Sequence, residues 1–246
     1  MPFSCAGRPR PAMFAVRVRC AWVGRGSALL RADTILLRRS YSLANITPVT
    51  SAELSGCVIV SGMPGAGKST VSGLAASLMP RAAQIKGDDV NQMILSGRVL
   101  FMAEPRDEAL RQYELCKRNM CALANNFVDY GFTVFMDTVV QDRSMLDLLV
   151  ALLSPRPARL VILAPGVEVC KYRNATRDPD ERFAFDGYQQ LETDMKRDLG
   201  DVGWWFDTSA LTPEQTADRL VREAVNRAAR LRGGWNSRLD EQPHDA

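Results

Sequence analysis

The sequence predicts an α/β protein built on a five-stranded parallel sheet with helices on both faces. Short apolar runs rich in β-branched residues alternate with longer stretches of helical periodicity, a pattern typical of repeated strand–helix–strand units. The expected strands are residues 57–61, 82–86, 132–136, 160–164 and 202–206. Ligands of such sheets bind at the carboxyl ends of the strands, so the functional residues are expected there.

Length and composition fit one such domain with additional segments. The chain has 246 residues, of which 46% are hydrophobic and 24% charged, as is ordinary for a soluble globular protein. It contains no run of 18 uncharged apolar residues, so no transmembrane helix is expected. We expect the folded domain to span residues 51–232 and a flexible polar tail to follow at 233–246.

The first 50 residues differ in charge from the rest. They hold eight arginines and one acid, Asp33, for a charge of about +7; since the whole chain is +3, the remainder carries about −4. This composition is that of a mitochondrial transit peptide, and Arg39–Ser42 resembles a cleavage site. The alternative, which we prefer, is a disordered extension or a translation start assigned too early. A cytoplasmic protein is then expected, and a matrix protein if the leader is a transit peptide. The acidic body argues against nucleic-acid binding.

Two function classes are disfavoured by missing motifs. The six cysteines form no CxxC pair and the single histidine is His244, so no zinc site is expected and the cysteines are expected to be reduced. The sequence also lacks the DxxG and NKxD motifs of GTPases.

A glycine-rich segment between the first strand and a helix carries the strongest functional signal. Residues 62–69 follow the pattern GxxxxGK[ST], the phosphate-binding P-loop. Glycines leave backbone N–H groups open to a phosphate, Lys68 reaches the β- and γ-phosphates, and the Ser69 hydroxyl is a Mg²⁺ ligand. The sequence therefore predicts binding of ATP with Mg²⁺. The expected nucleotide contacts in this loop are Gly62, Met63, Pro64, Gly65, Ala66, Gly67, Lys68, Ser69 and Thr70.

The second strand is followed by Gly87-Asp88-Asp89 and a helix. This arrangement resembles the P-loop kinases that include phage polynucleotide kinase, zeta-toxin-like sugar kinases and chloramphenicol phosphotransferase. The resemblance implies that an Asp after the second strand contacts the acceptor hydroxyl and accepts its proton. The polynucleotide-kinase spacing selects Asp88 and the chloramphenicol-phosphotransferase spacing selects Asp89; we prefer Asp88. One of the two can instead cap the helix.

The third strand ends at Asp137-Thr138. An apolar strand closing on Asp resembles a Walker B element, which helps to hold Mg²⁺ directly or through water. The resemblance also allows this position to touch the acceptor. The alternative is that Asp137 caps the helix expected near residues 141–153.

The segment after the fourth strand carries Arg173, Arg177 and Arg182. The first two are four residues apart and are expected on one helical face. The resemblance implies a short lid whose arginines close over the transferring phosphoryl group, with Arg177 the first candidate. A guanidinium suits this role because it pairs bidentately with phosphate oxygens and keeps its charge. The alternative is a surface face paired with the acids of residues 178–181.

The resemblance covers about residues 54–230 and implies a P-loop NTPase fold with strand order 2-3-1-4-5. It also implies a kinase that moves the γ-phosphoryl group of ATP to a hydroxyl of a small molecule such as an antibiotic, a sugar or a nucleoside. The acceptor pocket is expected in residues 101–130, which we interpret as two helical stretches.

Two other functions stay open. In a 5′-hydroxyl polynucleotide kinase the phage enzyme has an Arg three residues after its catalytic Asp, but here that position is Asn91. A non-catalytic ATP-binding regulatory protein would need neither the Asp pair nor the arginines. The sequence indicates no oligomeric state.

Overall fold

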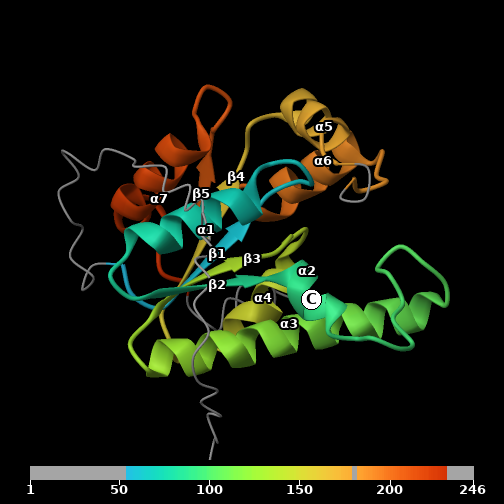
Figure 1. Cartoon of the computed structure of the whole chain (residues 1–246), viewed down its shortest axis with the longest axis horizontal. Helices are drawn as coiled ribbons and strands as arrows, with labels where there is room; N and C mark the ends of the chain where they lie inside the picture. The colour runs from blue at the N-terminus through green and yellow to red at the C-terminus, as the bar shows by residue number, and fades with distance from the viewer. Residues whose placement is uncertain (1–53, 179–181, 232–246) are drawn as a thin grey trace, which may run out of the picture. The chain divides into compact units, whose positions relative to one another are not determined.

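A computed structural model describes residues 54–178 and 182–231, so the predictions for the leader and for the tail lie outside the described residues. The fold is a five-stranded parallel sheet of order β2-β3-β1-β4-β5, which confirms the predicted architecture (Figure 1). The strands are β1 (Cys57–Ser61), β2 (Ala82–Lys86), β3 (Thr133–Asp137), β4 (Ala158–Leu163) and β5 (Trp204–Phe206).

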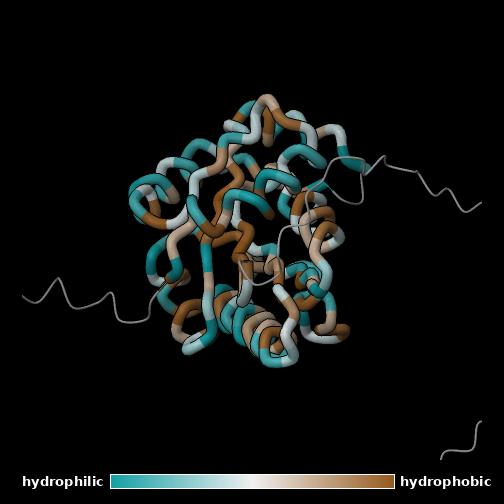
Figure 2. Tube along the Cα trace, turned by 90° about the vertical axis from the view of Figure 1, so that its left-hand side faces the viewer, coloured by the Kyte–Doolittle hydropathy of each residue, from teal (hydrophilic) through white to brown (hydrophobic). Residues whose placement is uncertain are grey.

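Helices cover both faces of the sheet. The helices are α1 (Lys68–Leu78), α2 (Gly87–Gln92), α3 (Arg106–Asp129), α4 (Arg143–Leu153), α5 (Val167–Ala175), α6 (Tyr188–Leu199) and α7 (Pro213–Arg227). Helices α1 and α7 pack together on one face, and α3 and α4 pack together on the other (Figure 1). Because both faces are covered, β1, β3 and β4 are buried along their whole length and consist mostly of apolar residues. Figure 2 shows these hydrophobic segments running through the middle of the described part of the chain.

The strand register gathers the functional segments at one edge of the sheet. Asp137, the last residue of β3, lies opposite Val60 of β1 and Lys86 of β2. The glycine-rich loop therefore leaves β1, and Gly87 leaves β2, at the same level as Asp137. Parallel pairing alone brings these three segments together.

One detail differs from expectation. Residues 101–130 contain one long helix, α3, rather than two helical stretches, because no Gly or Pro interrupts residues 106–129. A capping box begins α7: Gln215 N donates to Thr212 Oγ1 over 3.2 Å, and Thr212 N donates to Gln215 Oε1 over 2.9 Å. In β5, Trp204 is buried and Trp205 is partly buried. No helix among the described residues is both long and apolar enough to cross a membrane.

Candidate active site

The loop of residues 62–69, called here the phosphate loop, depends on glycine for its shape. Gly65 has φ 83°, and Gly67, the residue before α1, has φ 95°. Residues other than glycine rarely adopt such values. Space is also limited, because a Cβ on Gly65 would lie 2.2 Å from the carbonyl oxygen of Cys170 in α5. The glycines thus let the loop pass against α5 as well as leaving its N–H groups open.

Gly65→Ala is expected to destabilise the fold by about 2–5 kcal/mol, since it combines left-handed strain with overpacking against backbone. Gly131→Ala is the matched control, because Gly131 also has positive φ (78°) but has open space around its Cβ position. Thermal unfolding of both variants measures the difference. Equal losses of stability in the two variants would show that the close approach to Cys170 does not add to the effect of Gly65→Ala.

The phosphate loop and the start of α1 form an anion-binding surface. The first N–H groups of α1 have no partner within the helix, and the helix dipole places positive potential there. Lys68 Nζ donates to the carbonyl oxygen of Met63 over 3.0 Å, which holds the ammonium over the loop. Burial lowers the pKa of Lys68, while the charges of Asp137 and Asp88 oppose that shift. The ammonium of Lys68 therefore interacts electrostatically with both carboxylates.

The other predicted loop contacts differ in what they offer. Met63 and Ala66 are buried, so only their backbone groups are available. Pro64 is partly buried, while Ser69 and Thr70 are exposed. From β2, Gln84 Nε2 donates to the carbonyl oxygen of Ser69 over 2.7 Å and so fixes the first turn of α1. Sequence reasoning did not single out Gln84.

Ser69 and Asp137, both predicted to hold Mg²⁺, are in direct contact in the structure. Ser69 Oγ donates to Asp137 Oδ2. A hydroxyl and a carboxylate are hard oxygen ligands, and Mg²⁺ usually takes only one or two protein ligands beside phosphate and water oxygens. Burial raises the pKa of Asp137, a shift that a nearby cation would offset. The pair therefore fits a magnesium site.

Asp137 does not cap α4. That role belongs to Asp142, whose Oδ1 accepts from Met145 N over 2.8 Å. The carboxylate of Asp137 thus remains at the end of β3, beside the phosphate loop.

Asp88 and Asp89 occupy the first turn of α2 but face different surroundings. Neither side chain caps the helix. Asp89 pairs with Lys86 over 3.6 Å, and its side chain is 61% exposed. The charge of Asp88 instead acts on Lys68, Asp137 and Lys117. Of the two, Asp88 is therefore the one that interacts electrostatically with Lys68 of the phosphate loop.

Gly87 explains how Asp88 approaches the end of β3. A Cβ on Gly87 would lie 3.3 Å from the carbonyl oxygen of Asp137 and 3.5 Å from Met120 Sδ of α3. The absence of a side chain lets α2 begin close between β3 and α3. A side chain at residue 87 would therefore make a tight contact with the end of β3, which glycine avoids.

The three arginines do not share one helical face. Arg173 lies on α5, where its Nη1 donates to the carbonyl oxygen of Ala66 over 3.5 Å. Helix α5 ends at Ala175, so Arg177 lies beyond it, and the expectation of a shared face is wrong. Burial is the main cause that lowers the pKa of Lys68, and the charge of Arg177 adds to that shift. Arg182 Nε donates to the carbonyl oxygen of Arg177 over 2.9 Å.

Asn174, which the sequence did not suggest as a site residue, connects the end of α5 to the segment at Phe183. Its Nδ2 donates to the carbonyl oxygen of Phe183 over 2.8 Å, and Phe183 N donates back to its Oδ1 over 3.2 Å. Asn174 is buried at the end of α5. The paired bonds hold Phe183 against the helix that carries Arg173.

Lys117 of α3 is the second residue that sequence reasoning missed. Its side chain is buried, with the residue 4% exposed, and Nζ donates to Thr138 Oγ1. Burial lowers the pKa of Lys117 to about 8, against the opposing charges of Cys116, Asp88 and Asp137. A helical face that includes Tyr113, Met120 and Ala124 at the same spacing could have signalled that Lys117 points inward.

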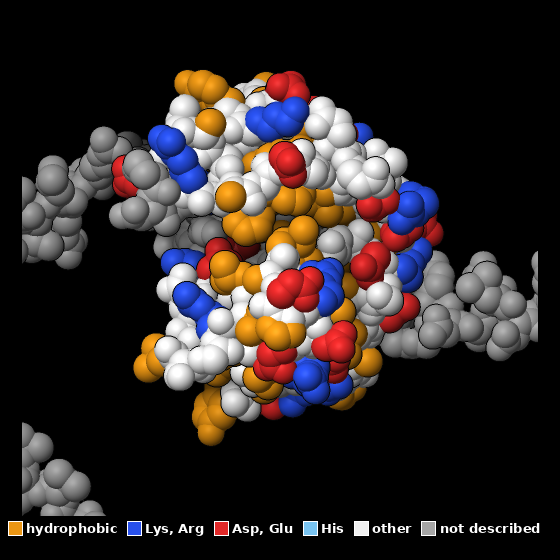
Figure 3. Space-filling model, turned by 90° about the vertical axis from the view of Figure 1, so that its right-hand side faces the viewer, with side chains coloured by type: hydrophobic (Ala, Val, Ile, Leu, Met, Phe, Trp, Pro, Cys, Tyr) orange, Lys and Arg blue, Asp and Glu red, His pale blue; other side chains and the backbone are white. Residues whose placement is uncertain are grey.

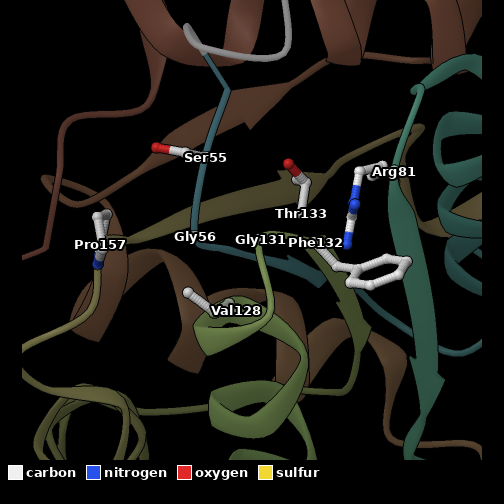
Figure 4. A pocket seen from close by; sticks show the side chains of 8 residues that line it. All are labelled: Ser55, Gly56, Arg81, Val128, Gly131, Phe132, Thr133 and Pro157. Atoms are coloured by element: carbon white, nitrogen blue, oxygen red, sulfur yellow. The ribbon is translucent and has the colours of Figure 1, made fainter.

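Figure 3 shows the side of the molecule that lies to the right in Figure 1, where hydrophobic side chains gather across the middle of the surface. A separate small pocket lies at the opposite, amino-terminal edge of the sheet (Figure 4). There the guanidinium of Arg81 stacks 4.6 Å from the centre of the Phe132 ring and donates to the carbonyl oxygen of Tyr130. None of the predicted site residues lines this pocket. Its lining residues are Ser55, Gly56, Arg81, Val128, Gly131, Phe132, Thr133 and Pro157.

Comparison with known proteins supports the fold. No family model matches the sequence, and no curated protein matches it. Among solved structures, a sugar kinase from a Janibacter species is similar with a TM-score of 0.52 and 18% identity, over 68% of this chain and 93% of that one. The tunicamycin resistance protein of Deinococcus radiodurans is similar with a TM-score of 0.51 and 14% identity, over 71% of this chain and 98% of that one. The chain therefore has the α/β fold of the P-loop kinases.

Proposed function

We propose that this protein is an ATP-dependent phosphotransferase that moves the γ-phosphoryl group to a hydroxyl of a small molecule. The observation that carries the proposal is the convergence of Lys68, Ser69, Asp88 and Asp137 at one edge of the sheet. Phosphate binding alone requires the loop and Lys68. A further carboxylate facing the loop is what a transfer reaction adds.

The donor half of the site is formed by the phosphate loop. Its backbone N–H groups and the α1 N-terminus bind the phosphates of ATP, and Lys68 exchanges the Met63 carbonyl for phosphate oxygens. Ser69 and Asp137 would hold Mg²⁺, which neutralises charge on the phosphate oxygens when bound.

In the transfer step the acceptor hydroxyl oxygen forms a bond to the γ-phosphorus while the bond between the γ-phosphorus and the bridging oxygen breaks. Asp88 accepts the hydroxyl proton, and ADP leaves with the bridging oxygen. Arg173 donates to the carbonyl oxygen of Ala66 in the loop, and Arg173, Arg177 and Arg182 would supply guanidinium groups that stabilise charge on the transferred group.

Two observations favour a small acceptor. The connection that follows α2, the helix of Asp88, exposes large apolar side chains: Met93, Leu95, Leu100 and Met102. An apolar surface in this place suits an acceptor with an apolar part rather than a phosphate-rich polymer. The similar solved structures also include a sugar kinase and an antibiotic resistance protein, in line with a small acceptor.

The test is transfer of label from [γ-³²P]ATP by the full chain to a panel of hydroxylated sugars, nucleosides and antibiotics, with a 5′-hydroxyl oligonucleotide as a further arm. We expect label on one class of small molecule, dependent on Mg²⁺. Label on the oligonucleotide alone would replace the proposal with a polynucleotide kinase. Tight ATP binding with no transfer to any hydroxyl would identify a non-catalytic ATP-binding protein instead.

A further inference from the structure

Lys117 differs from the exposed lysines of the described chain. The side chains of Lys86, Lys171 and Lys196 are 40%, 39% and 58% exposed, and each forms an ion pair. Lys117 is 4% exposed and forms no ion pair with any residue in 54–178 or 182–231. A cation is thus held in the interior of the protein without a bonded counter-charge.

The contacts of Lys117 connect α3 to the chain directly after β3. Its Nζ donates to Thr138 Oγ1 and lies 4.2 Å from the centre of the Tyr113 ring. Tyr113 Oη donates to the carbonyl oxygen of Val139 over 3.2 Å. Two side chains of α3, one helical turn apart, therefore donate hydrogen bonds to residues 138 and 139, immediately after Asp137.

Burying this ammonium opposes folding. Removing a cation from water is unfavourable unless a full set of partners replaces the lost hydration, and one hydroxyl and one aromatic ring replace only part of it. An unbranched apolar side chain of the same length would fill the space without that penalty. Stability alone therefore does not account for Lys117, and buried charges of this kind are concentrated at functional sites.

The charges around Lys117 indicate what its positive charge contributes to the site. Two carboxylates, Asp88 and Asp137, lie close enough to affect each other, and like charges repel. Lys68 and Lys117 are the cations that act on both carboxylates, from two different elements. If nucleotide binds as proposed, phosphate oxygens take up the charge of Lys68. Lys117 then remains as the counter-charge on the α3 side.

We propose that Lys117 is a positioning residue that anchors Thr138 beside Asp137 and provides the fixed positive charge that lets Asp88 and Asp137 operate together. The proposal rests on the proposed phosphotransfer function. Lys117 touches neither phosphate nor acceptor in this role, and it acts through the two carboxylates.

The test compares Lys117→Met with wild type, with Lys117→Arg, and with Lys196→Met as a matched control on exposed α6. We expect Lys117→Met to lower kcat on the order of tenfold to a hundredfold, as supporting residues of active sites do, while KM for ATP changes less than about threefold. Lys117→Arg should retain more activity than Lys117→Met. The midpoint of thermal unfolding, measured without nucleotide, should stay equal or rise in Lys117→Met.

A second variant separates charge from packing. Lys117→Ala should regain turnover when ethylammonium or propylammonium is added, but not when 1-propanol, a neutral molecule of similar size, is added. Rescue by 1-propanol, an unchanged kcat in Lys117→Met, or a fall in its unfolding midpoint of more than about 5 °C would each overturn the proposal. If wild type transfers no phosphoryl group at all, the proposed function fails separately. The unfolding midpoint of Lys117→Met then still shows whether the buried lysine lowers the stability of the protein.

Discussion

Asp88→Asn is expected to lower the rate of phosphoryl transfer by about 10²–10⁴-fold, the contribution typical of a positioned general base. The amide keeps the size of the side chain and cannot accept the proton of the acceptor hydroxyl. Affinity for ATP should stay within a few-fold, because in the proposed mechanism Asp88 contacts the acceptor and not the nucleotide. Steady-state kinetics with the acceptor found in the transfer screen, together with ATP titration calorimetry, measure both quantities.

Asp89→Asn is the matched control on the same helical turn. Its carboxylate pairs with Lys86 at the surface, so its loss should change turnover less than about twofold. If Asp89→Asn proves the more damaging substitution, the base is Asp89 and the surface pairing describes only the nucleotide-free state. If both variants keep full activity, neither carboxylate is the base.

Lys68→Met is expected to reduce kcat/KM for ATP by about 10³-fold, because it removes the ammonium aimed at the β- and γ-phosphates and leaves no other donor of equal reach. Without nucleotide the variant should be at least as stable as wild type, because burial already disfavours the charged form of Lys68.

The measurement is the rise in unfolding midpoint on adding Mg²⁺ and ATP, which follows affinity by mass action. Wild type should show a rise and Lys68→Met little or none. Lys171→Met, which removes an exposed lysine of α5 paired with Glu168, serves as the control and should keep the wild-type rise. An undiminished rise in Lys68→Met would contradict the assignment of the phosphate loop.

The five strands and the phosphate loop could be predicted from sequence because their signals are local. Each strand is a compact apolar run, and the GxxxxGK[ST] spacing needs only its flanking strand and helix. The expected strand limits differ from the observed ones by no more than two residues, as with β4, expected at 160–164 and found at Ala158–Leu163. β5 is shorter than expected because Gly203 turns the chain with φ 74° directly before Trp204.

The side-chain roles were harder to predict because they depend on distant partners. Spacing alone left Asp88 and Asp89 open, and the difference between them arises from Lys86 on one side and from Lys68 and Lys117 on the other. Lys117 was missed because its burial requires Thr138, 21 residues away in sequence. Arg177 was misplaced because helical spacing does not reveal that α5 ends at Ala175.

The contact between the phosphate loop and α5 has a mechanical consequence. Gly65 lies against the carbonyl oxygen of Cys170, and Arg173 reaches the carbonyl oxygen of Ala66. Helix α5 therefore rests on the loop at two points, one through backbone contact and one through a guanidinium. Because Gly65 has no free space toward Cys170, we expect a shift of the loop backbone in that direction, such as phosphate binding would cause, to move α5 and Arg173 with it.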